Sequence, residues 1–366
     1  MADPSFPALK EIFDRDRFRH IAAEAAAVWP AFDGKRFMAV ATKDLAALGI
    51  MQRVRRTATA LHAVLPEDFD RAASILRDLA PRVGHSFAAI ALSEYVALYG
   101  RNHFDRSMQA LRHLTRYGSS EFAIRHFLVG DFDRTLAVMR DWADDDNEHV
   151  RRLASEGSRP RLPWSFQLKN LIVDPSPTMP ILEALRADGS PYVRKSVANH
   201  LNDIGKDHPA ALIERVSGWD RGDPRTAWIV RHALRTLIKK GEPAALSLVG
   251  ATGKAEVAVR RFTVEPARIE LGERIAITAT LASAADCLQR LVVDYAVHYA
   301  RKGGAASRKV FKLKEIDLPA GGSAELSISQ AIRDFSTRKH HPGRHVVELL
   351  VNGETMAEGA FDLRIG

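Results

Sequence analysis

The sequence of 366 residues has a single cysteine, Cys287, so neither an intrachain disulfide nor a cysteine-based metal site can form. No uninterrupted apolar run is long enough to span a bilayer. The first residues, MADPSFPALKEIF, have neither the basic region nor the apolar region of a secretion signal. We therefore expect a cytoplasmic protein in a reducing compartment, with no membrane association.

Motifs of several enzyme classes are absent as well. The sequence has no P-loop, no G-x-S-x-G and no H-E-x-x-H. His340, His341 and His345 stand close together, but no cluster of acids or cysteines completes a metal site around them. We expect a protein that needs neither a metal nor a cofactor.

Positive charge, in contrast, is in surplus. Lysine and arginine number 53 against 45 acidic residues, which gives a formal net charge of +8. Such a balance favours a polyanionic partner, with nucleic acid first and an anionic membrane surface second. A solvated basic surface would produce the same charge.

Up to about residue 250 the apolar residues follow a helical period, as in ASILRDLAP, MQALRHL and LAVMRDW. Paired helices that recur about every 40 residues predict a HEAT-like solenoid, in a domain of residues 1–250. The repeated arginines of this pattern could line a concave surface or support packing between repeats. They are Arg125, Arg151, Arg194 and Arg231, in the segments SSEFAIRHFL, NEHVRRLASE, SPYVRKSVANHL and RTAWIVRHALRTL.

Beyond residue 250 the period changes to that of strands. RIAITATL, RLVVDYAVHYA and HVVELLV are rich in β-branched and aromatic residues, and Asn352-Gly353 is a hairpin signal. In RLVVDYAVHYA the residues Leu291, Val293, Tyr295, Val297 and Tyr299 fall on one face. About seven short strands predict an immunoglobulin-like β-sandwich in residues 257–366, without the Cys…Trp…Cys hallmark.

One segment, VRRLASEGSRPRLPWSFQLKN at 150–170, interrupts the helical pattern with positive charge. Gly157 and Pro160 are incompatible with one continuous helix, and we expect a new helix to start at Pro163. Trp164 would then lie at a helix start, at the rim of a surface, although a tryptophan buried between repeats is the commoner arrangement. The neighbouring arginines favour the rim, because a guanidinium binds phosphate oxygens in a bidentate way.

Two carboxylates could take part in chemistry. Glu121 is placed for the first turn of a helix and could pair with Arg125 one turn later, an ordinary role that involves no catalysis. Asp203 shares a polar helix edge with Lys195 and Asn199, opposite a predicted buried stripe. It could be a plain solvated residue, although an acid is mildly unfavourable at a helix C-terminus.

In the predicted sandwich, the loops RKGGAASRK (301–309) and TRKHHPGRH (337–345) concentrate basic residues. They are either solvated loop tips or a second nucleic-acid contact. We predict contact with DNA through Arg301, Lys302, Arg338, Lys339 and His340.

Long strings of the helical half resemble the AlkC family of bacterial alkylpurine DNA glycosylases. They are FDGKRFMAVATKDLAALGIMQRVRRTATAL, SMQALRHLTRYGSSEFAIRHFL, HVRRLASEGSRPRLPW and YVRKSVANHLNDIGKDHP. The resemblance covers residues 8–245, and the C-terminal part matches by architecture more than by motif. It implies a monofunctional DNA glycosylase for cationic alkylated bases, chiefly 3-methyladenine and 3-methylcytosine. The family acts on duplex DNA and need not flip the damaged nucleotide, and its product starts base-excision repair.

The resemblance also implies a site. The family's acidic and aromatic active-site residues map to Glu121, Trp164 and Asp203 as catalytic residues. The neighbouring basic residues map to phosphate clamps; they are Arg152, Arg159, Arg161, Arg194 and Lys195. We expect a monomer. The alternative is a non-catalytic HEAT-repeat scaffold that binds DNA or an acidic protein, which explains the charge and the fold but gives the three catalytic candidates no reason to converge.

Overall fold

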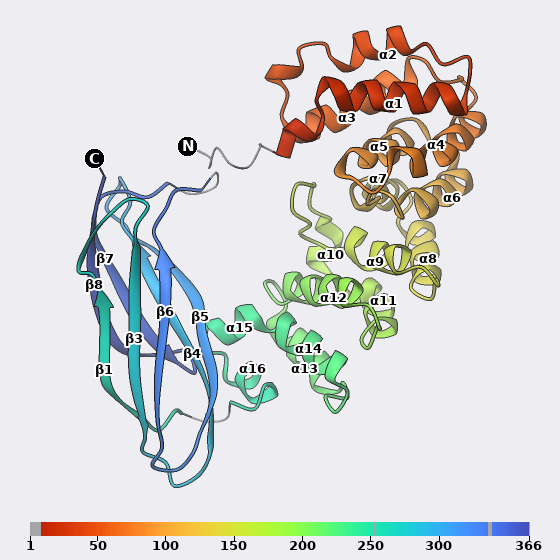
Figure 1. The fold of residues 1–366 in the computed structure, drawn as a ribbon. Helices are drawn as coiled ribbons and strands as arrows, with labels where there is room; N and C mark the ends of the chain where they lie inside the picture. The colour runs from red at the N-terminus through yellow and green to blue at the C-terminus, as the bar shows by residue number, and fades with distance from the viewer. Residues whose placement is uncertain (1–8, 252–253, 336–338, 366) are drawn as a thin grey trace. The chain divides into compact units, whose positions relative to one another are not determined.

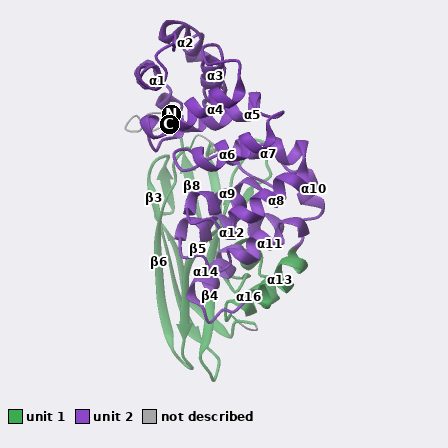
Figure 2. Ribbon diagram, turned by 90° about the vertical axis from the view of Figure 1, so that its right-hand side faces the viewer, with its two compact units in different colours: residues 1–6, 209–218, 234–366 green, residues 7–208, 219–233 purple. Residues whose placement is uncertain are grey.

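The computed structural model describes residues 9–251, 254–335 and 339–365 (Figure 1). The described chain is helical as far as Leu248 and forms strands from Val257 onward, which confirms the predicted order of a helical part and an all-β part. By compactness the chain divides into a helical unit, residues 7–208 and 219–233, and a sandwich unit that also includes residues 209–218 and 234–250 (Figure 2). The domain limits 1–250 and 257–366 stay a prediction.

The helical unit is a stack of helix pairs in two rows. In the first row α3, α5, α7, α9, α12 and α14 each contact the next, while α4 contacts α6 and α8 contacts α11 in the second row. This arrangement is the predicted solenoid. Its helices are α1 (Arg15–Val28), α2 (Gly34–Ala41), α3 (Ile50–His62), α4 (Phe69–Val83), α5 (Ile90–Tyr99), α6 (Phe104–Leu114), α7 (Glu121–Gly130), α8 (Phe132–Trp142), α9 (Glu148–Gly157), α10 (Lys169–Val173), α11 (Met179–Ala184), α12 (Pro191–Ile204) and α14 (Pro224–Ala233). In the described part of the chain, no helix combines the length and the hydrophobicity that a membrane crossing requires.

Local sequence explains why these helices begin where they do. The Asn147 side chain caps α9 by accepting a hydrogen bond from the His149 amide at 3.0 Å, and Ser190 caps α12 just before Pro191 at the first helical position. On α12 the predicted stripe is buried, with Val193, Val197 and Leu201 fully inaccessible. Apolar residues every three or four positions therefore set which face of the helix points into the core.

The repeated arginines hold the turns between helices. Arg151 donates to the carbonyls of Asp145 and Asp146 at 2.9 and 3.0 Å, and Arg194 donates to those of Asp188 and Gly189 at 2.7 and 2.8 Å. Arg125 is fully buried and likewise binds backbone carbonyls. For these three positions the structure favours support of packing over a row of exposed cations.

The sandwich unit has two sheets. Their strand orders are β1-β3-β6 and β2-β8-β7-β4-β5, antiparallel throughout except for the parallel pair β2 and β8. The elements are α13 (Pro209–Ser217), α15 (Arg235–Lys239), α16 (Pro243–Leu248), β1 (Val257–Glu265), β2 (Arg268–Glu270), β3 (Arg274–Ser283), β4 (Gln289–Tyr299), β5 (Ser307–Leu318), β6 (Ser323–Ala331), β7 (Gly343–Val351) and β8 (Glu354–Arg364). Asn352 and Gly353 join β7 to β8 with positive φ values of 48° and 82°, as the hairpin signal predicted.

The inner strand β4, which lies between β7 and β5, is buried on both faces. The predicted inward face, from Leu291 to Tyr299, lies in the core between the sheets. The other face is covered as well, and Asp294 is buried within it. Burial raises the pKa of Asp294 to about 6, although Lys239 and Lys312 oppose the shift.

We expect Asp294→Asn to stabilise the protein at neutral pH by about 1–3 kcal/mol, because it removes a buried charge. The pKa of Asp294 is higher in the folded than in the unfolded chain, so wild-type stability rises as the pH falls from about 6 toward 4, and the variant loses that rise. Urea unfolding of both proteins at pH 5 and pH 7 measures this difference. A variant that is less stable than the wild type at pH 7 would mean that the Asp294 carboxylate gains more from the two lysines than it loses by burial.

Candidate active site

Consecutive helices of the first row bring acidic and basic side chains into one chain of ion pairs, the carboxylate–guanidinium chain. Glu121 lies on α7, Glu156 on α9 and Asp203 on α12, with Arg152 and Arg159 between them. The distances, in order along this chain, are Glu121–Arg152 2.7 Å, Arg152–Glu156 3.6 Å, Glu156–Arg159 2.6 Å and Arg159–Asp203 2.8 Å. Two of the three predicted catalytic residues are thus linked through arginines.

Glu121 is the first residue of α7, where the helix N-terminus favours a negative charge. Its Oε2 accepts hydrogen bonds from Arg152 and from the Ser119 hydroxyl, both at 2.7 Å, and its side chain is 14% exposed. The expected pair with Arg125 is wrong, because the Arg125 guanidinium binds the backbone of the segment 157–166. Glu121 is therefore held in place by residues outside its own helix.

Asp203 is not a solvated residue on a polar edge. It is only 2% exposed and pairs with Arg159 and with Lys206 Nζ at 2.8 Å. Lys195 on the same edge is exposed, whereas Arg159 and Lys206 pair with Asp203 at the end of the helix, so the helical wheel alone gave the wrong exposure for Asp203. A buried carboxylate of this kind needs its partners, because removal of one leaves an uncompensated charge.

Several predicted phosphate clamps are engaged within the protein. Arg159 is 7% exposed and binds both Glu156 and Asp203, and Arg161 forms two hydrogen bonds with Asp207 at 2.9 and 2.8 Å. The Arg194 guanidinium binds carbonyls, as described above, whereas Lys195 is exposed on α12. Their contact with phosphates stays a prediction.

Trp164 lies in a turn, not at the start of a helix. The next helix, α10, begins at Lys169, which corrects the start predicted at Pro163. The ring is 61% exposed, as expected for the rim, and it meets Phe87 edge-on with centroids 6.0 Å apart. The backbone of Trp164 has φ 65°, a left-handed conformation that costs a bulky residue about 1–3 kcal/mol.

The strained turn is held by Arg125. Its guanidinium donates to the carbonyls of Gly157 at 3.0 Å, Arg159 at 2.7 Å and Phe166 at 2.5 Å. Arg125 lies on α7 one turn after Glu121, so a single helix carries the acid and anchors the segment that carries the tryptophan. We name this set of hydrogen bonds the Arg125 clamp.

A pocket of about 360 Å³ brings Glu121 and Trp164 together. Asp203 does not line it and reaches it only through Arg159. Sequence reasoning missed two residues of this pocket. Glu156 lies one turn after Arg152, at the end of the segment NEHVRRLASE. The ring of Tyr192 lies 4.7 Å from the Arg152 guanidinium carbon. The lining residues are Phe87, Ile90, Ser119, Glu121, Phe122, Arg152, Glu156, Arg159, Leu162, Pro163, Trp164 and Tyr192.

The sandwich unit has a basic pocket of its own, of about 480 Å³. Arg301, Lys302 and Lys339 line it, while Arg338 lies outside the described residues. His340 differs from its prediction as a loop-tip contact, because it is buried and its amide donates to Asp334 at 2.8 Å. His341 lines the pocket instead. Among the described residues, no three His, Cys, Asp or Glu side chains gather as a metal site requires.

Comparison with known proteins adds to this geometry. The sequence pattern of the family described as DNA alkylation repair enzyme matches residues 30–237, and that of the C-terminal Ig-like domain of YhaZ matches residues 258–365. The chain is 39% identical over 347 residues to the Uncharacterized protein YhaZ of Bacillus subtilis (strain 168), which covers 94% of this chain and 96% of that protein.

A solved structure is more similar still. It is the alkylpurine DNA glycosylase AlkC of Pseudomonas fluorescens, bound to DNA that contains an abasic site analog. The two chains share 56% identity and superpose with a TM-score of 0.94 over 98% of this chain and 100% of that one. Together these matches confirm the fold class, and this chain belongs to the AlkC family of alkylpurine DNA glycosylases, within the DNA alkylation repair enzymes.

Proposed function

We propose that this glycosylase removes cationic alkylated bases, chiefly 3-methyladenine and 3-methylcytosine, from duplex DNA by hydrolysis of the N-glycosidic bond. The observation that carries the proposal is that a fixed carboxylate, Glu121, and an exposed ring, Trp164, line one pocket. The DNA-bound relative supports DNA as the partner. We also propose that the protein acts as a cytoplasmic monomer, because one chain supplies both the site and a basic sandwich.

The chemistry needs few groups. A base methylated at N3 is already cationic and leaves without a general acid, so the enzyme has to stabilise an oxocarbenium-like sugar and position a water. A carboxylate does both, and we assign this role to Glu121, whose mostly buried side chain weakens competition from solvent. The exposed face of the Trp164 ring attracts the cationic base through a cation–π interaction, which contributes about 0.5–2 kcal/mol depending on desolvation.

Asp203 has a different part in the proposal. It is buried behind Arg159 and does not line the pocket, so we assign it as a positioning residue. Its charge holds Arg159, which borders the pocket and carries one of the carbonyls of the Arg125 clamp.

The site also supports action without base flipping. Enzymes that flip a base receive it in an enclosed pocket, which stacks side chains on both of its faces. Here the aromatic residue is mostly exposed at the rim of the pocket. Binding energy would then come from the backbone, with Lys195 and the sandwich residues Arg301, Lys302 and Lys339 as phosphate contacts.

The test is release of free bases from methylated duplex DNA. We expect release of 3-methyladenine and 3-methylcytosine, an intact abasic strand, and no covalent imine after borohydride treatment, because the described residues that line the pocket include no lysine. DNA binding is measured in parallel at several salt concentrations. The slope of the logarithm of the binding constant against the logarithm of the salt concentration should be smaller in magnitude by about 1.8 in Arg301→Gln/Lys302→Gln, as expected for two lost phosphate contacts. Binding without release would favour a non-catalytic scaffold, and a trapped imine would overturn the monofunctional mechanism.

A further inference from the structure

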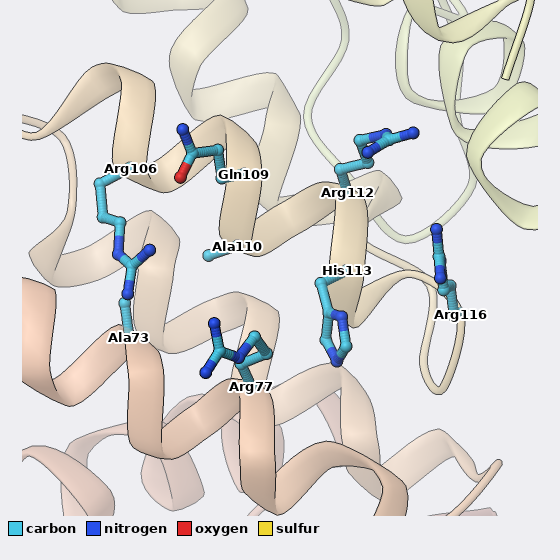
Figure 3. A pocket seen from close by; sticks show the side chains of 8 residues that line it. All are labelled: Ala73, Arg77, Arg106, Gln109, Ala110, Arg112, His113 and Arg116. Atoms are coloured by element: carbon cyan, nitrogen blue, oxygen red, sulfur yellow. The ribbon is translucent and has the colours of Figure 1, made fainter.

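A second pocket in the helical unit lies between α4 and α6, in the row that does not carry the catalytic residues. It has a volume of about 230 Å³ and shares no lining residue with the pocket of Glu121 and Trp164. Figure 3 shows Arg77 on α4 facing Arg106 and the His113 ring of α6, with Arg116 on the turn that follows. The described residues that line this pocket include four arginines and no carboxylate.

Three of these arginines are fixed by neighbours outside the pocket. Arg106 Nη2 donates to the Asp70 carbonyl at 3.2 Å and to the Ser74 hydroxyl, and Arg112 Nε donates to Asp145 at 2.6 Å. Arg77 uses Nε on the adjacent Asp78 at 3.0 Å. These contacts fix the orientation of three of the basic side chains that line the pocket.

Hydrogen-bonding capacity remains inside that space. Arg106 Nε, His113 Nε2 and Arg116 Nε are buried and have no partner within hydrogen-bond distance in the part of the chain that the structure describes. Asp70 Oδ1 lies 3.9 Å from Arg106 Nε, and the backbone of Arg77 and the charge of Asp78 act on the His113 ring by raising its pKa. Buried polar groups are nearly always satisfied, so three such nitrogens in one pocket indicate a missing acceptor. An anion would fit this space, because the carboxylates that pair with the arginines, Asp70, Asp78 and Asp145, all lie outside its lining and leave the lining itself positively charged.

We propose that this pocket binds a phosphate group, with Arg77 and Arg116 as its ligands and His113 as a donor that becomes protonated as the anion enters. The guanidinium fork matches phosphate oxygens, and a charge-assisted hydrogen bond to phosphate is stronger than a neutral one. Without the anion, burial and then the charge of Arg116 hold the pKa of His113 below its usual range. The phosphate belongs either to a DNA backbone or to a free phosphate compound, and the site lies outside the catalytic pocket in both cases.

The test follows the His113 ring by NMR across pH, with and without inorganic phosphate, in the full-length protein. We expect phosphate to raise the pKa of His113 by about 1, and to do so neither in Arg77→Gln nor in Arg116→Gln. The matched control is Arg71→Gln/Arg15→Gln, which removes two exposed arginines that do not line the pocket and should respond as the wild type does.

A second arm separates the two sources of phosphate. Affinity for undamaged duplex DNA is measured against salt in the control and in Arg77→Gln/Arg116→Gln. If the slope of log binding constant against log salt concentration is smaller in magnitude by about 1.8 in the pocket variant, the site binds the DNA backbone. If the slope is unchanged while phosphate still raises the pKa of His113 in the wild type, the site binds a free phosphate compound. No His113 response to phosphate, or an equal response in the pocket variants, overturns the proposal. Base release is not measured here, so failure of the glycosylase assignment would not alter the result.

Discussion

Glu121→Gln is expected to slow base release by about 10²–10³-fold while DNA binding stays unchanged. Glutamine keeps the shape of the side chain and an oxygen that can accept from Arg152 and Ser119. It cannot stabilise the developing positive charge on the sugar. Single-turnover release of 3-methyladenine, with binding measured at one fixed salt concentration, gives both quantities.

The control for this experiment is Glu148→Gln. Glu148 is also the first residue of a helix, α9, and bonds to a serine, Ser190, yet it does not line the pocket. We expect wild-type release from this variant. Asp203→Asn should lower the stability of the protein as well as the rate, because it removes one of the two buried carboxylates that pair with Arg159. If Asp203→Asn instead lost release with full stability while Glu121→Gln retained it, the two carboxylates would exchange roles.

Arg125→Met is expected to destabilise the protein by about 3–5 kcal/mol, because three carbonyls lose a charged donor in a buried site. Burial lowers the pKa of Arg125 to about 10, so the guanidinium is still charged at neutral pH and the full interaction is at stake. Release of the clamp should also let Trp164 leave its left-handed backbone conformation. Base release should therefore fall further than stability alone explains, since rate depends steeply on placement.

Unfolding in urea, limited proteolysis of the segment 157–166 and base release together measure the effect. Arg140→Met is the matched control, because Arg140 donates to a single exposed carbonyl, that of Pro177, at 3.2 Å. We expect it to cost under about 1 kcal/mol. An Arg125→Met variant with wild-type release and unchanged proteolysis would show that the turn keeps its shape without the clamp.

Local patterns predicted the features that depend on neighbours in sequence. The stripe of α12, the helical period to Leu248 and the Asn352-Gly353 hairpin all follow from spacing of three to four residues or of two. Local spacing does not predict the backbone conformation where a residue far away in the sequence determines it. The turn at Trp164 depends on Arg125, about forty residues earlier, and no propensity of the segment itself predicts a tryptophan with positive φ.

Local patterns also failed to predict the solvent exposure of two polar side chains. Asp203 and His340 read as surface residues because a helical wheel or a basic loop considers only one element. Their burial comes from Arg159 and from Asp334, which the fold brings to them. Glu156 could have been found, since it follows Arg152 by four residues in a repeat that was already noted, whereas Tyr192 had no local signal.

The Arg125 clamp has a mechanical consequence. Helical-repeat proteins are elastic, because each repeat contacts only its neighbours and small rotations add up along the stack. An enzyme built this way can bend to follow a deformed duplex, but bending would normally change the relative positions of functional groups that lie on different repeats. Here Glu121 and the anchor of Trp164 share the ten residues of α7, so both groups travel as one rigid body when the stack flexes. The solenoid can therefore flex during DNA binding while Glu121 and Trp164 keep their relative positions.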